Sequence, residues 1–195
     1  MKEWPLPAEH SERRGCGGIV LVGLGSGAEV GPCSLPPLAD ATRRLADVLA
    51  LPVLKLETAT SPDAALRLIG EKAQACGGGW LAGLEIDVGV TLADGRCWAE
   101  ALGAWRQPAL LVVPAAQLAG GMPAAATALL LRWQVPLLGL LQWGGHWQAE
   151  TRRRDTLPWL GLLPESDATH PSRDSDEVVT LATALALRWQ QLDQR

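Results

Sequence analysis

Mostly hydrophobic, strand-length runs alternate with amphipathic segments along the chain. The hydrophobic runs are bounded by Gly or Pro and occupy residues 17–25, 52–57, 79–90, 108–116, 135–143 and 157–165. Strands that are apolar on both sides are typical of a parallel sheet covered on both faces. Segments with helical periodicity lie at residues 39–51, 61–75, 94–105, 122–133 and 176–195. This alternation predicts an α/β fold in three layers, with a mostly parallel sheet and helices on both faces.

One of the predicted helices has a recognisable N-terminal capping sequence. Ser61 precedes Pro62 and Asp63, an arrangement that favours a helix capped by the Ser61 hydroxyl and beginning at the proline. Residues 1–17 are polar and contain two prolines, so we expect a flexible leader there. No linker divides the remainder, which predicts a single domain over residues 18–195.

Composition and charge narrow the class of protein. Of the 195 residues, 48% are hydrophobic and 19% are charged, which is enough apolar surface for a core. A formal net charge of -4 disfavours nucleic acid and anionic membrane surfaces as partners. The first residues lack the apolar core of a signal peptide, and no apolar run is long enough to span a bilayer. The four cysteines form no CxxC pair, so we expect reduced thiols in a cytoplasmic protein.

Ligands of open α/β sheets bind at the carboxyl ends of the strands, which directs attention to the loops there. The loop after the first run is rich in glycine, reading Gly23-Leu-Gly25-Ser-Gly27-Ala-Glu29-Val30-Gly31-Pro32-Cys33-Ser34. Such a loop can point backbone N–H groups at an anion, although a tight turn with no phosphate is an equal alternative.

One interpretation of this loop is a dinucleotide site. Gly23, Gly25 and Ala28 fit the G-x-G-x-x-G/A pattern, and Glu57 ends the second run where a ribose-binding acid would lie. However, prolines at 32, 36 and 37 delay the helix, and Glu57 comes later than the roughly 20 residues expected.

The second interpretation is a phosphate loop of another kind. Residues 25–33 align with the dethiobiotin synthetase pattern G-T-D-T-x-V-G-K-T, with Val30-Gly31 in register. Lys55 falls where that family has a Lys-Pro-Val stretch, and Glu85-Ile-Asp87-Val-Gly89 falls on its E-G-A-G-G element. The stretch 93–141 and the run LPWLGLLPE at 157–165 are similar to the family's later strands and helices. The chain thus resembles dethiobiotin synthetase over most of residues 18–165.

The resemblance implies a P-loop NTPase-like fold, a homodimer, and a site for ATP and Mg²⁺. In that site Lys55 would be catalytic and Glu85 would bind the metal. Gly25, Gly27, Glu29, Val30, Gly31, Cys33 and Ser34 would hold the nucleotide. If the chain is an enzyme, the resemblance implies an ATP-dependent cyclo-ligase.

The departures from the family concern its phosphoryl chemistry. Pro32 stands at the position of the phosphate-loop lysine, and Cys33 stands where a hydroxyl would bind magnesium. Proline has no charge and no N–H, and a thiol is a soft ligand that Mg²⁺ disfavours. Phosphoryl transfer depends on positioned positive charge, so these changes predict a loss of rate by several orders of magnitude. The family's Asn-His pair has also become Met122-Pro123.

Several other residues have a structural explanation beside a functional one. Lys55 and Glu85 could form an ion pair, and Asp63 or Asp87 could replace a missing metal ligand. Arg152, Arg153 and Arg154 are expected on a solvated surface, and His146 in an exposed loop. Trp143 and Trp147 flank the loop where the resembled family places its nucleotide base. We expect these two side chains to pack beneath the loop and not to bind a ligand.

These observations lead to a first hypothesis and two alternatives. The first is a divergent dethiobiotin-synthetase-like protein that has lost efficient ATP-dependent carboxylation and acts as a binding or regulatory domain for a small molecule or nucleotide. The second is a working ligase with an altered loop. The third is a Rossmann-like dinucleotide binder that uses Gly23, Gly25 and Glu57.

Overall fold

A computed structural model of the chain describes residues 17–24, 38–76, 79–165 and 176–193. Its strands are β1 (Gly18–Gly23), β2 (Trp80–Leu84), β3 (Ala109–Pro114), β4 (Leu137–Trp143) and β5 (Trp159–Leu163). The helices are α1 (Leu38–Leu49), α2 (Pro62–Cys76), α3 (Trp98–Ala104), α4 (Met122–Arg132), α5 (Ala149–Arg154) and α6 (Asp176–Asp193), and a 3₁₀ turn covers Ala115–Gln117. Of the predicted leader, only Gly17 lies inside these described residues.

The five strands form one sheet in the order β2-β1-β3-β4-β5, and every neighbouring pair is parallel. The predicted parallel sheet is therefore confirmed. Because the chain moves from β1 to β2 on one side and then crosses to β3 on the other, β1 lies where the winding changes direction. Parallel strands place all their carboxyl ends at the same edge of the sheet, and this edge carries the loops examined below.

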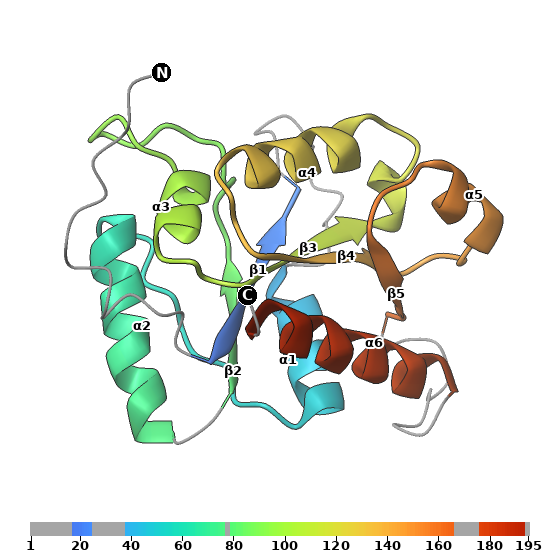
Figure 1. Cartoon of the computed structure of the whole chain (residues 1–195), viewed down its shortest axis with the longest axis horizontal. Coiled ribbons are helices and arrows are strands. Elements are labelled where there is room, and N and C mark those ends of the chain that lie inside the picture. The colour runs from blue at the N-terminus through green and yellow to red at the C-terminus, as the bar shows by residue number, and fades with distance from the viewer. Residues whose placement is uncertain (1–16, 25–37, 77–78, 166–175, 194–195) are drawn as a thin grey trace.

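Helices cover both faces of the sheet (Figure 1). On one face, Leu66 and Ile69 of α2, Trp98 of α3 and Leu130 of α4 are buried against the strands. On the other face, α1 and α6 lie side by side, and their buried side chains are Ala41, Leu45, Ala46, Leu181 and Leu185. The sheet is thus the middle of three layers. The residues of β1 to β4 are almost all buried, and those of the edge strand β5 are mostly half-buried. This burial explains why the sequence shows continuous apolar runs instead of alternation.

The predicted strand over residues 52–57 is wrong. This segment forms a single parallel bridge, from Val53 to Leu81, and no strand. Two hydrogen bonds hold it beside β2, from Leu54 N to Leu81 O at 2.8 Å and from Leu81 N to Pro52 O at 2.9 Å. The segment lies at the sheet edge, where Val53 is half exposed, so it forms only part of a ladder.

The helix starts follow the predicted chemistry in part. The backbone N–H of Ala64 donates to the Ser61 hydroxyl, and the helix begins at Pro62 as expected. An Asp-Gly pair favours a turn, and Asp94 and Gly95 form one ahead of α3, with Arg96 N donating to the Asp94 carboxylate; the helix begins after it, at Trp98. Among the described residues, no helix combines the length and apolar character required to cross a bilayer.

Candidate functional site

A hollow at the carboxyl end of β2 contains predicted site residues, and we call it the β2 cleft. Its volume is about 610 Å³, within the range usual for small-molecule sites. It lies between the first half of α1, the edge segment that follows Pro52, and the residues that end β2. Its walls are Ala39, Thr42, Arg43, Val53, Leu54, Lys55, Leu56, Glu57, Thr58, Ala59, Gly83 and Glu85.

A close approach between α1 and β2 shapes one wall of the cleft. A Cβ atom added to Gly83 would lie 2.9 Å from the Thr42 hydroxyl, which is too near for an ordinary contact. The same hydroxyl donates to the Leu38 carbonyl at 2.7 Å, so it is fixed toward its own helix. Glycine at position 83 therefore lets the start of α1 lie directly on the strand, next to the strand's carboxyl end.

Among the described residues, four charged side chains line the β2 cleft, two of them cationic and two acidic. Lys55 Nζ lies 3.4 Å from Glu57 Oε2, and the two side chains are 80% and 35% exposed. Arg43 pairs with Asp40, one turn earlier on α1, at 2.9 Å. Glu85 is exposed at the end of β2. Each cation therefore already has an acidic partner, and the formal charges of the four lining groups cancel.

The structure brings the two principal predicted site residues into one place, since Lys55 and Glu85 both line the β2 cleft. The ion pair offered as an alternative explanation for Lys55 and Glu85 is not formed, because Lys55 pairs with Glu57. The nucleotide-loop residues Gly25, Gly27, Glu29, Val30, Gly31, Cys33 and Ser34 lie outside the described residues. Gly23 ends β1.

The position of Glu57 bears on the dinucleotide interpretation. In a Rossmann sheet the strand that carries the ribose-binding acid pairs directly with the first strand. Here the segment that carries Glu57 is bridged to β2, and β2 separates it from β1. The segment of Glu57 is thus one strand further from β1 than that interpretation requires.

Asp63 and Asp87, the proposed substitutes for a metal ligand, are engaged elsewhere. Asp63 pairs with Arg96 and accepts a hydrogen bond from Trp105 Nε1 at 2.5 Å, which fastens the start of α2 to α3. Asp87 accepts from Gly89 N at 2.7 Å within its own turn. Neither residue lines the β2 cleft.

Arg96 holds the α2–α3 contact through two carboxylates. Besides Asp63, its Nε lies 3.0 Å from Glu100 Oε1. Burial lowers the pKa of the Arg96 guanidinium, but the hydrogen bonds and negative charges of Asp63 and Glu100 outweigh it, so the pKa is raised above its ordinary value. The Arg96 guanidinium therefore has a structural role, linking α2 to α3, and remains charged at any physiological pH.

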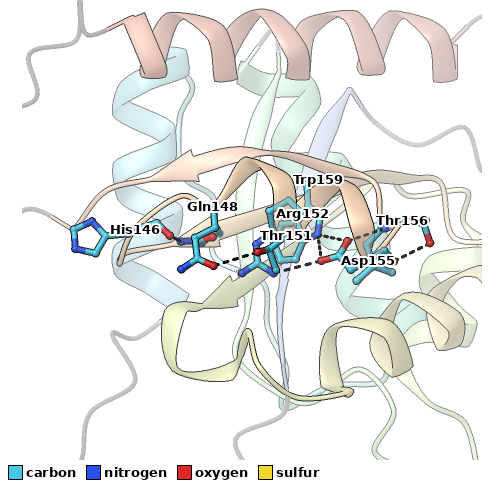
Figure 2. A network of polar contacts seen from close by, with 9 residues as sticks. His146, Gln148, Thr151, Arg152, Asp155, Thr156 and Trp159 are labelled. Atoms are coloured by element: carbon cyan, nitrogen blue, oxygen red, sulfur yellow. Dashed lines mark hydrogen bonds and ion pairs between the residues drawn. The ribbon is translucent and has the colours of Figure 1, made fainter.

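A second polar network lies around α5, between the carboxyl end of β4 and the start of β5 (Figure 2). Both carboxylate oxygens of Asp155 lie 2.9 Å from Trp159 Nε1, and Oδ2 is 3.3 Å from Arg152 NH1. The Arg152 guanidinium lies 4.8 Å from the centre of the Trp159 ring. Arg152 is only 9% exposed, so the prediction of a solvated surface is wrong for this residue; Arg153 and Arg154 are exposed as expected.

The loop after β4 is held from beneath by a buried side chain. Gln142 is fully buried, and its Nε2 donates to the carbonyls of Gly144 and His146 at 2.9 and 3.1 Å. Gly144 and Gly145 both have φ near +70°, which glycine adopts without strain. Trp143 is buried, which confirms the packing role predicted for it, and His146 is exposed and points away from the network in Figure 2. Because Gln142 lies within an apolar run, the sequence did not indicate that its side chain supports this loop.

The charged groups of the β2 cleft do not fit a Mg-ATP centre. Glu57 and Glu85 are the carboxylates that line it, and Glu57 is occupied by Lys55. A triphosphate requires a surplus of positive charge, and Mg²⁺ requires several free oxygen ligands. In the parts of the chain that the structure describes, no three His, Cys, Asp or Glu side chains form a group that could hold a metal ion.

A scan against models of known protein families finds no match to this sequence, and a search of curated proteins finds no significant match either.

Proposed function

We propose that the protein is a divergent relative of dethiobiotin synthetase that binds a small molecule in the β2 cleft and has lost efficient ATP-dependent carboxylation. It acts as a binding or regulatory domain. The observation that supports this proposal best is the balance of charge in the cleft, where Arg43 and Lys55 face Glu57 and Glu85.

Balanced charges favour a ligand that itself carries both signs. A molecule with an ammonium group and a carboxylate can exchange the Lys55–Glu57 pair for one contact with each partner. A triphosphate offers negative charge alone, and it would have to separate Lys55 from Glu57 and Arg43 from Asp40 without satisfying either acid. The triphosphate would then lie beside those carboxylates, and the repulsion between like charges disfavours ATP.

The sequence of the glycine-rich loop supports the same conclusion. Pro32 and Cys33 supply neither the charge nor the hydroxyl that a phosphate loop uses. The substitutions in the loop and the paired charges in the cleft are independent observations, and both disfavour bound triphosphate.

The proposal is tested by calorimetric titration with Mg-ATP, NAD, NADP and a set of diamino and monoamino carboxylic acids. We expect saturable binding of at least one zwitterionic acid and no saturation by the three nucleotides in the micromolar range. The Lys55→Gln variant should lose that binding. Lys72→Gln is the matched control, because Lys72 is an exposed lysine on α2 that does not line the cleft.

Two results would contradict the proposal. Micromolar binding of Mg-ATP would favour a working ligase with an altered loop. Binding of NAD or NADP that disappears in Glu57→Ala would favour the dinucleotide interpretation.

A further inference from the structure

A second hollow, which we call the α5 pocket, lies at the other edge of the sheet from the β2 cleft. It has a volume of about 340 Å³ and is bounded by α5 and the residues that lead into β5. Its walls are Trp147, Ala149, Arg152, Arg153, Thr156, Leu157 and Trp159. In the described part of the chain, its lining contains two large aromatic rings and two guanidinium groups, and no carboxylate.

The aromatic walls are held in fixed orientations. The rings of Trp147 and Trp159 meet edge to face, with centroids 6.2 Å apart and an interplanar angle of 78°. Trp159 is also fixed by its indole N–H, which lies 2.9 Å from both carboxylate oxygens of Asp155. Rings that are already ordered lose little entropy when a flat ligand packs against them, so the pocket is prepared for an aromatic body.

The two arginines of the pocket have different surroundings. Arg152 is buried, stacks on Trp159 and contacts Asp155, so much of its binding capacity is used within the protein. Its Nε is nevertheless buried without a hydrogen-bond partner among the described residues. Arg153 is exposed at the pocket rim, and no ion pair involves it in the described part of the chain. The pocket thus has one structural cation and one available cation.

A purely structural role explains only part of this arrangement. Arg152 and Asp155 bind α5 to β5, and basic residues in the last turn of a helix interact favourably with its dipole. Neither effect requires Trp147 to stand against Trp159. The dipole interaction involves Arg153 but does not require its guanidinium to lie at the rim of an apolar hollow. A flat apolar surface beside an unpaired cation is complementary to an aromatic ring that carries an acid group.

We propose that the α5 pocket binds a small aromatic anion, with its ring against Trp147 and Trp159 and its acid group on Arg153. This site is separate from the β2 cleft, so the proposal does not depend on the function proposed for that cleft. The ligand class is an aromatic carboxylate or sulfonate.

The first test uses 1-anilinonaphthalene-8-sulfonate as the probe and its fluorescence as the readout. We expect saturable binding to the full-length protein and competition by 2-naphthoate. Arg153→Gln should weaken the affinity roughly tenfold, the effect of losing one charge-assisted contact. Arg154→Gln is the matched control, because Arg154 is the next residue on the same short helix and does not line the pocket. Equal affinity in both variants, or binding that does not saturate, would overturn the proposal.

The second test locates the probe independently of affinity. The chain contains nine tryptophans, and their indole N–H signals can be followed by NMR during a titration with 2-naphthoate. The signals of Trp147 and Trp159, assigned with Trp147→Phe and Trp159→Phe, should shift first and together. If a different set of indole signals moves while these two stay in place, the pocket is not the binding site.

Discussion

Lys55 and Glu57 form an ion pair across a spacing of two residues on an extended edge segment, with Nζ and Oε2 3.4 Å apart. Alternate residues of an extended chain share a side, so both side chains face the β2 cleft. The pair is solvent-exposed, and exposed pairs contribute about 0–1 kcal/mol to stability. The pair therefore places one charge of each sign in the cleft and contributes little to the stability of the fold.

This relationship predicts that Lys55→Gln leaves the fold almost unchanged. The free energy of unfolding, measured by urea denaturation, should fall by less than about 1 kcal/mol. The same variant should lose the zwitterion binding described above. A drop of several kcal/mol would show that Lys55 is part of the folding core and would undermine its use as a binding residue.

Gly103 is predicted to be intolerant of any side chain. An added Cβ would lie 1.8 Å from the carbonyl oxygen of Trp133, a backbone atom that can move only with the end of α4. Gly103→Ala should therefore destabilise the protein by about 3 kcal/mol or more, although alanine normally stabilises a helix by up to about 1 kcal/mol relative to glycine.

Gly121→Ala is the control for this prediction. Gly121 precedes α4, has an ordinary φ of -77° and has open space around its Cβ position. We expect a change within about 0.5 kcal/mol. Similar urea midpoints for the two variants would contradict the close packing of α3 on the end of α4.

Asp155 is predicted to hold the α5 region together. Asp155→Ala removes the acceptor of the Trp159 indole and the partner of Arg152, whose side chain is only 9% exposed. Leaving that guanidinium without a carboxylate should cost about 2–4 kcal/mol in urea denaturation. Glu150→Ala, on the exposed side of the same helix, should cost less than about 0.5 kcal/mol. An Asp155→Ala variant with an unchanged free energy of unfolding would show that the network in Figure 2 does not contribute to stability.

The Arg96–Asp63 ion pair predicts how the stability of the protein depends on salt and pH. Asp63→Asn should cost about 1 kcal/mol, because both partners are one-third exposed and solvent screens the pair. The pKa of Arg96 is raised, so the stabilising charge is present below its ordinary pKa and is lost only when the pH rises past the raised value. Arg96 itself should therefore add no pH dependence in the neutral and mildly alkaline range. A cost of Asp63→Asn that is unchanged by high salt would contradict the electrostatic account.

The strands of the sheet could be predicted from the sequence because buried strands consist mainly of apolar residues. Strands β1 to β4 are almost entirely buried, so their runs are apolar except for Gln142, and the half-buried β5 is apolar as well. Residues 52–57 failed as a strand because the segment lies at the edge, where Lys55 is exposed and Val53 makes a single bridge. Helix α5 was missed because AETRRR has no apolar periodicity.

The candidate sites were predictable only in part. Residues at strand ends were expected to meet, and Lys55 and Glu85 do line one cleft, but the pairing of Lys55 depends on where the edge segment lies beside β2. Arg152 could not be placed from its charge, since its burial depends on Trp159, a residue of the neighbouring strand. Gln142 was hidden in an apolar run, although it supports the loop after β4.

Calorimetric titration of the purified protein with Mg-ATP tests the central claim most directly. If the paired charges of the β2 cleft and the substitutions at Pro32 and Cys33 exclude a triphosphate, no saturable heat should appear in the micromolar range, while a zwitterionic acid binds and Lys55→Gln abolishes its binding. Micromolar binding of Mg-ATP, accompanied by formation of the cyclic urea of dethiobiotin at an ordinary enzymatic rate, would contradict the account.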